Sequence, residues 1–403
     1  MNRRSFLGLA LGTAAAAQLR CSLGEVPVRP PAPPPPIRLP LDPTRDRPAP
    51  DFERVHPDEP HLVGVRPHRK TGVRLELGAP IAGKPVVHNY GHSGAGITLS
   101  LGCAEEAARL VGEARQLHAG GVAELAILGS GIIGLTTAAA IRRAHPDLKI
   151  RIYAADLALQ STTSWVAGGQ FEPSGVRSAY KEDEAGQARL AGWLRASRDR
   201  ITALRPQWDA LGIARRDNFT LDHDSGGYDA TPRDVVPAPA TIALPFAGLR
   251  DRGRLYRTWL LNPRIWMPAL VKELTAGGVS FVQRRFGSIR DVAALTESIV
   301  VNCTGYGAKA LFQDDDVVPY RGHLVRLERP SQAHDYFFSA GCENKVIAYV
   351  FCRQDDIVIG GTYVPRDDRT TIEQDDVPVF AGVIDNNRRV FEGRSDACRW
   401  LPE

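Results

Sequence analysis

The sequence lacks the features that mark membrane-spanning, nucleic-acid-binding and zinc-binding proteins. No apolar run approaches the roughly 18 residues that span a bilayer, so no membrane-spanning helix is expected. The net charge of +4 is small for 403 residues, and it gives no indication of a nucleic-acid partner. The remaining composition is that of a globular chain long enough for two domains.

Cysteine is scarce and scattered along the chain. No two cysteines form a C-x-x-C pair, so we predict no zinc site from them: Cys21, Cys103, Cys303, Cys342, Cys352 and Cys398. Cys342 and Cys352 could pair across a hairpin. That pairing stays open, because the N-terminus points to folding in a reducing compartment.

The first 25 residues are predicted to be an export signal. The run NRRSFL at 2–7 resembles the twin-arginine signature, and an apolar stretch and small residues near Ala15 and Ala17 follow it. This implies recognition by the twin-arginine machinery and a periplasmic or extracellular location, with membrane association if the signal is not cleaved. A basic disordered tail and a lipoprotein anchor at Cys21 are the alternatives, although Arg20 fits an anchor poorly.

Residues 26–60 are expected to be a disordered linker. Thirteen of the thirty prolines lie between 27 and 60, a composition typical of extended chain that does not pack a core. Folded structure is therefore predicted to begin near His61.

A nucleotide-binding start follows at residues 124–156. An apolar strand at 124–128 leads into GSGIIG at 129–134, a helix at 132–144 and a second strand at 149–154. In this pattern Gly129 permits the tight turn, Gly131 the close approach of a pyrophosphate, and Gly134 close packing of helix on strand. Asp156 is placed to take the ribose hydroxyls. The motif predicts a dinucleotide site and does not separate FAD from NAD.

Coarser patterns predict several further elements. We expect helices at 103–115, 185–211 and 264–276 and a strand at 279–284. His88 and His92 have the i, i+4 spacing of a zinc pair, but the Asn89-Tyr90-Gly91 between them argues against a helix, so no metal is expected.

Four stretches resemble the D-amino-acid oxidase family. STTSW with AGGQFEP at 161–173 is similar to its flavin-contacting loop, and SIVVNCTG at 298–305 to its later strand ending in Thr-Gly. VPYRGH at 318–323 resembles its P-x-R-G-Q stretch, with His323 in place of glutamine, and DIVIGGT at 356–362 resembles its next strand and turn.

The order of the segments departs from that family. HNYGHSGAGIT at 88–98 with Gly102-Cys103-Ala104, preceded by VRPHR at 65–69 and VRLE at 73–76, resembles the signature that normally closes the chain. Here it precedes the nucleotide start. Residues 391–402 resemble the helix that normally leads into that signature, yet the chain stops there.

The resemblance therefore implies a circularly permuted oxidase fold of the α/β class: a Rossmann-type FAD domain interleaved with an α+β substrate domain. The expected divisions are a displaced C-terminal segment at 61–118, a Rossmann core at 119–175 and mixed segments of both domains at 176–403. The residues from Gly112 to Ala123 would bridge the displaced segment to the first Rossmann strand. Permutation requires that the old termini lie close together.

The family's chemistry, implied by this resemblance, is transfer of the α-hydrogen of a D-amino acid as hydride to flavin N5, with water and dioxygen then giving a 2-oxo acid, ammonia and hydrogen peroxide. Arg66 matches the carboxylate-binding arginine, with Arg69 and Arg74 as substitutes. Tyr349 matches the tyrosine that donates to the same carboxylate, and Gly94 the glycine whose carbonyl accepts from the amine. Tyr336 could be a second, mobile tyrosine over the pocket.

The resemblance also implies FAD as the cofactor. Beyond Asp156, its contacts are expected from the glycine loop, the flavin-contacting loop, the Thr-Gly turn and the displaced signature: Gly129, Gly131, Ile132, Ile133, Gly134, Ser161, Thr162, Thr163, Gly168, Gln170, Thr304, Gly305, Ser93, Gly96, Ile97 and Thr98. Ser93 stands where the family has glycine, which leaves its own role in doubt. Ala155 stands where relatives often carry a charge.

Four other functions remain open. A D-aspartate oxidase and a glycine or secondary-amine oxidase would use the same fold, and a flavin-binding protein without turnover would share the cofactor site. A serine hydrolase is suggested by GHSGA at 91–95, but the last residue is alanine and no strand–turn–helix frames the serine. The side-chain preference among D-amino acids stays open.

Overall fold

The computed structural model describes residues 46–117, 124–222, 226–341 and 347–394. The export signal, Cys21, Cys342 and the chain end after 394 lie outside this part, so the predictions that fall on them stay predictions. None of the helices described is long and apolar enough to cross a membrane.

Two sheets organise the described chain. The first has six strands in the order β2-β3-β10-β4-β5-β9, and its members are Arg74–Ile81, Lys84–Tyr90, Ile299–Asn302, Glu124–Leu128, Lys149–Ala154 and Ser280–Gln283. All neighbours are parallel except β2 and β3. β4 and β10 lie centrally, which explains their nearly continuous apolar sequences.

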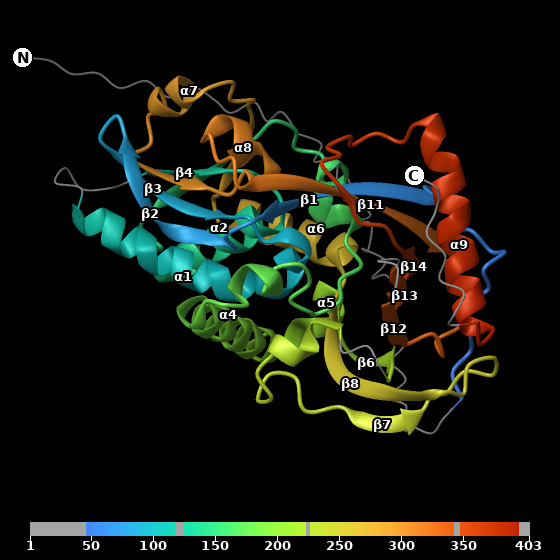
Figure 1. The fold of residues 1–403 in the computed structure, drawn as a ribbon. Helices are drawn as coiled ribbons and strands as arrows, with labels where there is room; N and C mark the ends of the chain where they lie inside the picture. The colour runs from blue at the N-terminus through green and yellow to red at the C-terminus, as the bar shows by residue number, and fades with distance from the viewer. Residues whose placement is uncertain (1–45, 118–123, 223–225, 342–346, 395–403) are drawn as a thin grey trace, which may run out of the picture. The chain divides into compact units, whose positions relative to one another are not determined.

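The second sheet has nine strands in the order β1-β11-β14-β13-β12-β6-β8-β7, with β15 paired to β11. Its strands are His61–Arg69, Val317–Leu327, Ile357–Gly360, Ile347–Cys352, Tyr336–Gly341, Ile213–Leu221, Arg252–Leu261, Ala240–Ala243 and Val364–Pro365. β1 runs antiparallel to β11 over its whole length, so Arg66 faces Tyr320 in the register. Figure 1 shows this pairing as the blue β1 beside the orange β11.

Helices cover the sheets. α1 packs against β3, α2 and α4, while α9 packs against β11, β13 and β14. The helices are α1 Gly96–Leu117, α2 Ile132–Ala144, α3 Thr163–Val166, α4 Glu184–Ala203, α5 Trp208–Leu211, α6 Pro263–Ala276, α7 Ile289–Ala293, α8 Ala308–Leu311 and α9 Val377–Phe391. The strands and helix of the nucleotide start, β4, α2 and β5, have the predicted bounds.

The prediction that residues 26–60 are disordered is wrong for 46–60. Arg47 is buried and pairs with Asp217 at 3.1 Å and with Asp335, and the Phe52 ring lies 5.8 Å from that of Phe391. Proline favours an extended chain, and an extended chain can still pack when its other side chains have partners.

Two helix predictions also need correction. The helix expected over 185–211 ends at Ala203, because Pro206 lacks an N–H and a 3-10 turn separates α4 from α5. The helix expected over 103–115 runs from Gly96 to Leu117. Gly112 is thus part of α1, and the predicted bridge shrinks to residues 118–123, which lie outside the described residues.

Candidate active site

The glycine loop, residues 129–134, connects β4 to α2. Gly129 has a φ of +111°, and a side chain there would overlap the carbonyl of Cys303. A side chain at Gly134 would overlap the carbonyl of Gly129, whereas at Gly131 it would meet only Ser164 Oγ at 3.4 Å. Space therefore lies beside Gly131, where the first turn of α2 begins. This cradle fits the pyrophosphate of a dinucleotide.

Asp156 lies beside this loop at the end of β5. Ser130 Oγ donates to the Asp156 carbonyl at 3.5 Å, and the exposed carboxylate accepts from the Ala158 N–H at 2.9 Å. The position suits the predicted contact with ribose hydroxyls.

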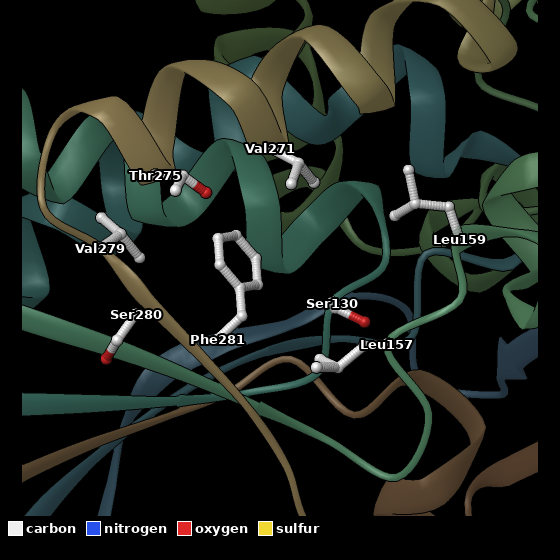
Figure 2. A pocket seen from close by; sticks show the side chains of 8 residues that line it. All are labelled: Ser130, Leu157, Leu159, Val271, Thr275, Val279, Ser280 and Phe281. Atoms are coloured by element: carbon white, nitrogen blue, oxygen red, sulfur yellow. The ribbon is translucent and has the colours of Figure 1, made fainter.

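A cavity of about 460 Å³ opens next to the same loop. Figure 2 shows its lining residues on α6, at the start of β9 and in the loops that follow β4 and β5, with the Phe281 ring in the middle. Its lining is mainly apolar, with three hydroxyls: Ser130, Leu157, Leu159, Val271, Thr275, Val279, Ser280 and Phe281. Because Ser130 belongs to both, the cavity is part of the nucleotide region.

The segment that precedes the glycine loop in sequence joins it in space. β3 pairs with β10 so that His88 faces Asn302, whose Nδ2 donates to His88 Nδ1 at 3.1 Å. Asn302 Oδ1 accepts from the Thr304 N–H at 3.1 Å and from its hydroxyl at 2.7 Å. The predicted contact segments at 88–98 and 304–305 thus lie together. Burial lowers the pKa of His88 to about 4.

The start of α1 is held against the flavin-contacting loop. Thr98 Oγ1 donates to the Glu172 carbonyl at 2.7 Å and accepts from the Glu172 N–H at 2.9 Å. Thr163 Oγ1 donates to the Val65 carbonyl at 2.8 Å, and Ser164 Oγ accepts from the first α2 amide, Ile132, at 3.1 Å. The loop therefore touches the glycine loop, β1 and α1.

Several predicted cofactor contacts have their side chains engaged elsewhere. The Gln170 amide donates to Asn218 and Tyr228, the Thr162 hydroxyl caps α3, and the Ser161 hydroxyl donates to Ala158. Ser93 has a φ of +49°, and its hydroxyl bonds to His68 at 3.3 Å and to Tyr363. For Ser93, this leaves the backbone as the part that can meet a cofactor.

Arg66 extends from the middle of β1. Its Nη1 donates to the Thr362 carbonyl at 3.2 Å, and its guanidinium carbon lies 5.4 Å from the Tyr363 ring centre. A side chain at Gly94 would lie 3.7 Å from Arg66 Cδ, so this predicted amine-binding glycine is adjacent. Within the described residues, no carboxylate lies within 4 Å of this guanidinium. The guanidinium therefore keeps N–H donors with which it can bind both oxygens of an anion.

Tyr349 completes the grouping. Its ring is buried on β13, stacks on Phe351 at 4.6 Å, and lies against Gly360 and Gly361. Burial raises the pKa of its hydroxyl, and the charge of Arg66 together with a hydrogen bond from it opposes that rise. An oxygen that accepts from Arg66 keeps its own proton to donate. Arg66, Tyr349, Gly94, Thr362 and Tyr363 are called the Arg66 site below.

The two substitute arginines are already paired. Arg69 Nε donates to Asp314 at 2.8 Å, and Arg74 Nε donates to Glu76 at 2.7 Å. The prediction of a mobile Tyr336 is wrong, because this side chain is fully buried in β12 and donates to the Pro48 carbonyl at 2.7 Å.

Sequence reasoning missed four residues around Arg66. The Tyr363 ring lies 4.3 Å from that of Tyr320, tilted by 30°, and the ring of His68 meets Tyr320 edge-on at 5.0 Å. Thr362 supplies the carbonyl that accepts from Arg66. The register of β1 with β11 brings Tyr320 and His68 together, and alternation along β1 was the signal that could have found His68.

Comparison with known proteins finds a family and several relatives that this chain resembles. The family model described as FAD dependent oxidoreductase (DAO) matches residues 124–400. A D-amino-acid oxidase from Streptomyces coelicolor is 28% identical over 240 residues, covering 59% of this chain and 69% of its own. The human D-aspartate oxidase is 25% identical over 254 residues, covering 60% and 68%. A D-amino-acid oxidase from Rubrobacter xylanophilus is 61% identical over 54 residues, 13% of this chain and 16% of its own.

Among solved structures, a glycine oxidase from Geobacillus kaustophilus matches with a TM-score of 0.45 at 15% identity, covering 69% of this chain and 80% of its own. The family model covers most of the chain and includes the glycine loop, whose shape fits a dinucleotide. The chain therefore belongs to the FAD dependent oxidoreductase (DAO) family, and FAD is its cofactor.

Proposed function

We propose that this enzyme oxidises D-amino acids, with Arg66 holding the substrate carboxylate. The observation that carries the proposal is the guanidinium of Arg66, which has no carboxylate partner among the described residues and lies beside the buried hydroxyl of Tyr349. A planar guanidinium binds both oxygens of a carboxylate, and a tyrosine O–H adds a third donor. The D-amino-acid and D-aspartate oxidases among the relatives support an amino-acid substrate.

The roles of the site residues follow from their chemistry. Arg66 and Tyr349 would bind the carboxylate, and the Gly94 carbonyl would accept from the amine. Contacts that fix two of the four groups on Cα also fix the directions of its two remaining bonds. In a D-amino acid one of these is the Cα–H bond, and this is the positioning that hydride transfer requires. FAD supplies the hydride acceptor, and dioxygen is the expected final oxidant.

The direct test is a substrate panel. Purified, flavin-loaded protein is offered D- and L-forms of alanine, aspartate, proline and lysine, and glycine, while hydrogen peroxide and ammonia are measured. We expect both products from at least one D-amino acid and none from its L-enantiomer. Turnover confined to D-aspartate or to glycine would support the alternative oxidases. A flavin that none of these compounds reduces would contradict the proposed oxidase function and leave a binding protein.

We also propose that the fold is circularly permuted. The family model begins at residue 124, yet β1 and β3, which precede it, pair with β11 and β10 inside the two sheets. The two chain ends that the usual order would connect also meet: Phe52 contacts Phe391, and Glu53 pairs with Arg388 at 2.6 Å. In the usual order the residues near 391 continue into those near 52, so this contact is what a permuted chain predicts.

A reordered chain tests the permutation. Residues 124–403, followed by a flexible linker and residues 46–117, would restore the family's usual order. We expect this protein to fold, bind FAD and keep turnover, because the contacts of both segments are retained. Failure to bind FAD with several linker lengths would contradict the permutation.

Export through the twin-arginine route is a third proposal, based on NRRSFL at 2–7. Replacing Arg3 and Arg4 together by lysine should retain the protein inside a bacterial host, whereas the unaltered chain should be recovered outside the inner membrane. Equal recovery of both would contradict the proposal.

A further inference from the structure

A buried side chain on β11 connects to Arg66 through one intermediate. His323 has 2% of its surface exposed. Its Nδ1 lies 2.7 Å from Thr362 Oγ1, and its Nε2 lies 2.9 Å from Asp376 Oδ1. Thr362 is the residue whose carbonyl accepts from Arg66 at 3.2 Å. A chain of contacts therefore runs from Asp376 through His323 and Thr362 to Arg66.

The hydrogen-bond directions in this chain are determined by its partners. The His323 backbone N–H donates to Thr362 Oγ1 at 3.0 Å, so the hydroxyl proton is free to donate to His323 Nδ1. Nδ1 is then the acceptor, and Nε2 carries the ring proton, which it donates to Asp376. Arg321 Nη1 lies 3.1 Å from Nε2, but its proton is directed to Asp376 Oδ1 at 2.6 Å.

The far end of the chain is rigidly held. Arg321 is fully buried and donates to both oxygens of Asp376, at 2.6 and 2.7 Å. Its other donors go to the carbonyls of Arg369 and Thr371. The Arg321 hydrogen bonds hold the pKa of Asp376 well below its usual range, so this carboxylate stays charged. A bidentate buried pair of this kind restricts the rotamers of every group bonded to it.

We propose that His323 is a positioning residue for Arg66. It clamps the Thr362 hydroxyl through its ring and its backbone, and this fixes the carbonyl that orients the guanidinium. The inference rests on the proposed role of Arg66 in carboxylate binding. Glutamine, the residue that the family places here, offers one acceptor and one donor at the end of a longer chain, so it replaces the histidine only in part.

The test measures carboxylate binding without turnover. Benzoate is a carboxylate with no α-hydrogen to lose, and its binding to the flavin-loaded protein is followed by the flavin spectrum. His323→Leu should weaken benzoate binding about fivefold to tenfold, the loss expected when a hydrogen bond worth about 1 kcal/mol no longer orients the guanidinium. His323→Gln should recover part of it. His334→Gln, a buried histidine bonded to Ser331 and Ala49, is the matched control and should leave binding unchanged.

A double variant separates positioning from general damage. If His323 acts through Arg66, then His323→Leu should add no further loss of binding to Arg66→Ala. Additive losses would overturn the inference, as would unaltered binding in His323→Leu. If this variant does not fold, Thr362→Val replaces it, because valine removes the hydroxyl and keeps the carbonyl. If His323→Leu loses its flavin, or if its free energy of unfolding falls by as much as its free energy of benzoate binding, the role of His323 is structural and positioning is contradicted.

A different result is expected if Arg66 does not bind the carboxylate at all. If Arg66→Ala leaves benzoate binding intact, or the parent protein does not bind benzoate, then Arg66 is not the carboxylate site and both proposals fall. If Arg66→Ala weakens binding and His323→Leu does not, the role of Arg66 stands and the role of His323 is contradicted.

Discussion

The glycine loop takes its shape from a short stretch of sequence, whereas the Arg66 site collects its groups from β1, β13, the turn before α1 and the turn after β14. In the loop, Gly134 lies against Gly129, five residues earlier. In the Arg66 site, Thr362 and Arg66 are 296 positions apart. A change in the loop should therefore remove the cofactor and all activity at once, whereas changes around Arg66 should weaken substrate binding in separate steps.

The largest expected effect comes from Gly129→Val. Gly129 has a backbone φ of +111°, which β-branched residues rarely adopt, and a side chain there would overlap the Cys303 carbonyl. We expect loss of bound FAD and of detectable oxidation, measured by flavin absorbance and peroxide formation. Retention of a full complement of FAD would contradict the assigned role of the loop.

A pH effect on stability should be the next largest, and it concerns His88 on β3, in the sheet that carries the glycine loop. His88 bonds to Asn302, which also holds Thr304. Burial lowers the pKa of His88 from 6.5 to about 4. Between these two pH values the histidine is therefore protonated in the unfolded chain and neutral in the folded chain. The stabilising contribution is complete above pH 6.5 and falls as the pH drops toward 4. The loss is about 1.4 kcal/mol per pH unit, or about 3 kcal/mol in all.

Urea unfolding at several pH values between 7 and 4 checks this expectation. Burial also lowers the pKa of His92, to about 3, so this histidine should contribute in the same direction. His88→Gln should remove the contribution of one titrating group and make the plot of unfolding free energy against pH shallower. An unchanged slope in that variant would show that His88 is not responsible.

Tyr349→Phe should have a smaller effect on the Arg66 site. The ring and its packing on Phe351 remain, and only the hydroxyl that contacts Arg66 is lost. We expect kcat/KM for a good D-amino acid to fall about tenfold to thirtyfold, the lower part of the range for a hydrogen bond to a charged group, because Arg66 still holds the carboxylate. A loss as large as that of Arg66→Ala would mean that the tyrosine does more than bind the carboxylate.

The smallest effect belongs to Gly192→Ala on α4, which serves as the control for Gly129→Val. A side chain at Gly192 meets no atom within 4 Å, and alanine favours a helix. Stability should rise by about 0.5 to 1 kcal/mol with FAD content unchanged. If Gly192→Ala also lost FAD, the loss of FAD from Gly129→Val could not be assigned to the glycine loop.

The same contrast explains how much could be predicted from sequence. β4, α2 and β5 were predicted with their bounds because a glycine motif, an apolar run and a proline are all local signals. Arg66 and Tyr349 could be named only through resemblance to a family, because no local pattern connects residues on β1 and β13.

The parts of the site that went unpredicted depend on strand register and on pairing across the sheet. His323 was noted as a departure from the family, but its bond to Thr362 exists only once β11 and the turn after β14 meet. The packing of Arg47 against Asp217 was also invisible, because a proline-rich composition does not show which charges find partners.

The most direct test of carboxylate binding by Arg66 compares Arg66→Ala and Arg66→Lys with Arg69→Ala in the flavin-loaded enzyme. Arg69 lies on the same strand, and its partner is Asp314. Steady-state oxidation of the best D-amino acid is measured with flavin content checked by absorbance. A bidentate pair is worth at least about 3 kcal/mol, so Arg66→Ala should lower kcat/KM about a hundredfold or more. Arg66→Lys should keep much of that defect, because an ammonium cannot reproduce the fork. FAD content should stay normal in both, and Arg69→Ala should change turnover far less. Turnover close to that of the parent enzyme in Arg66→Ala would contradict the account.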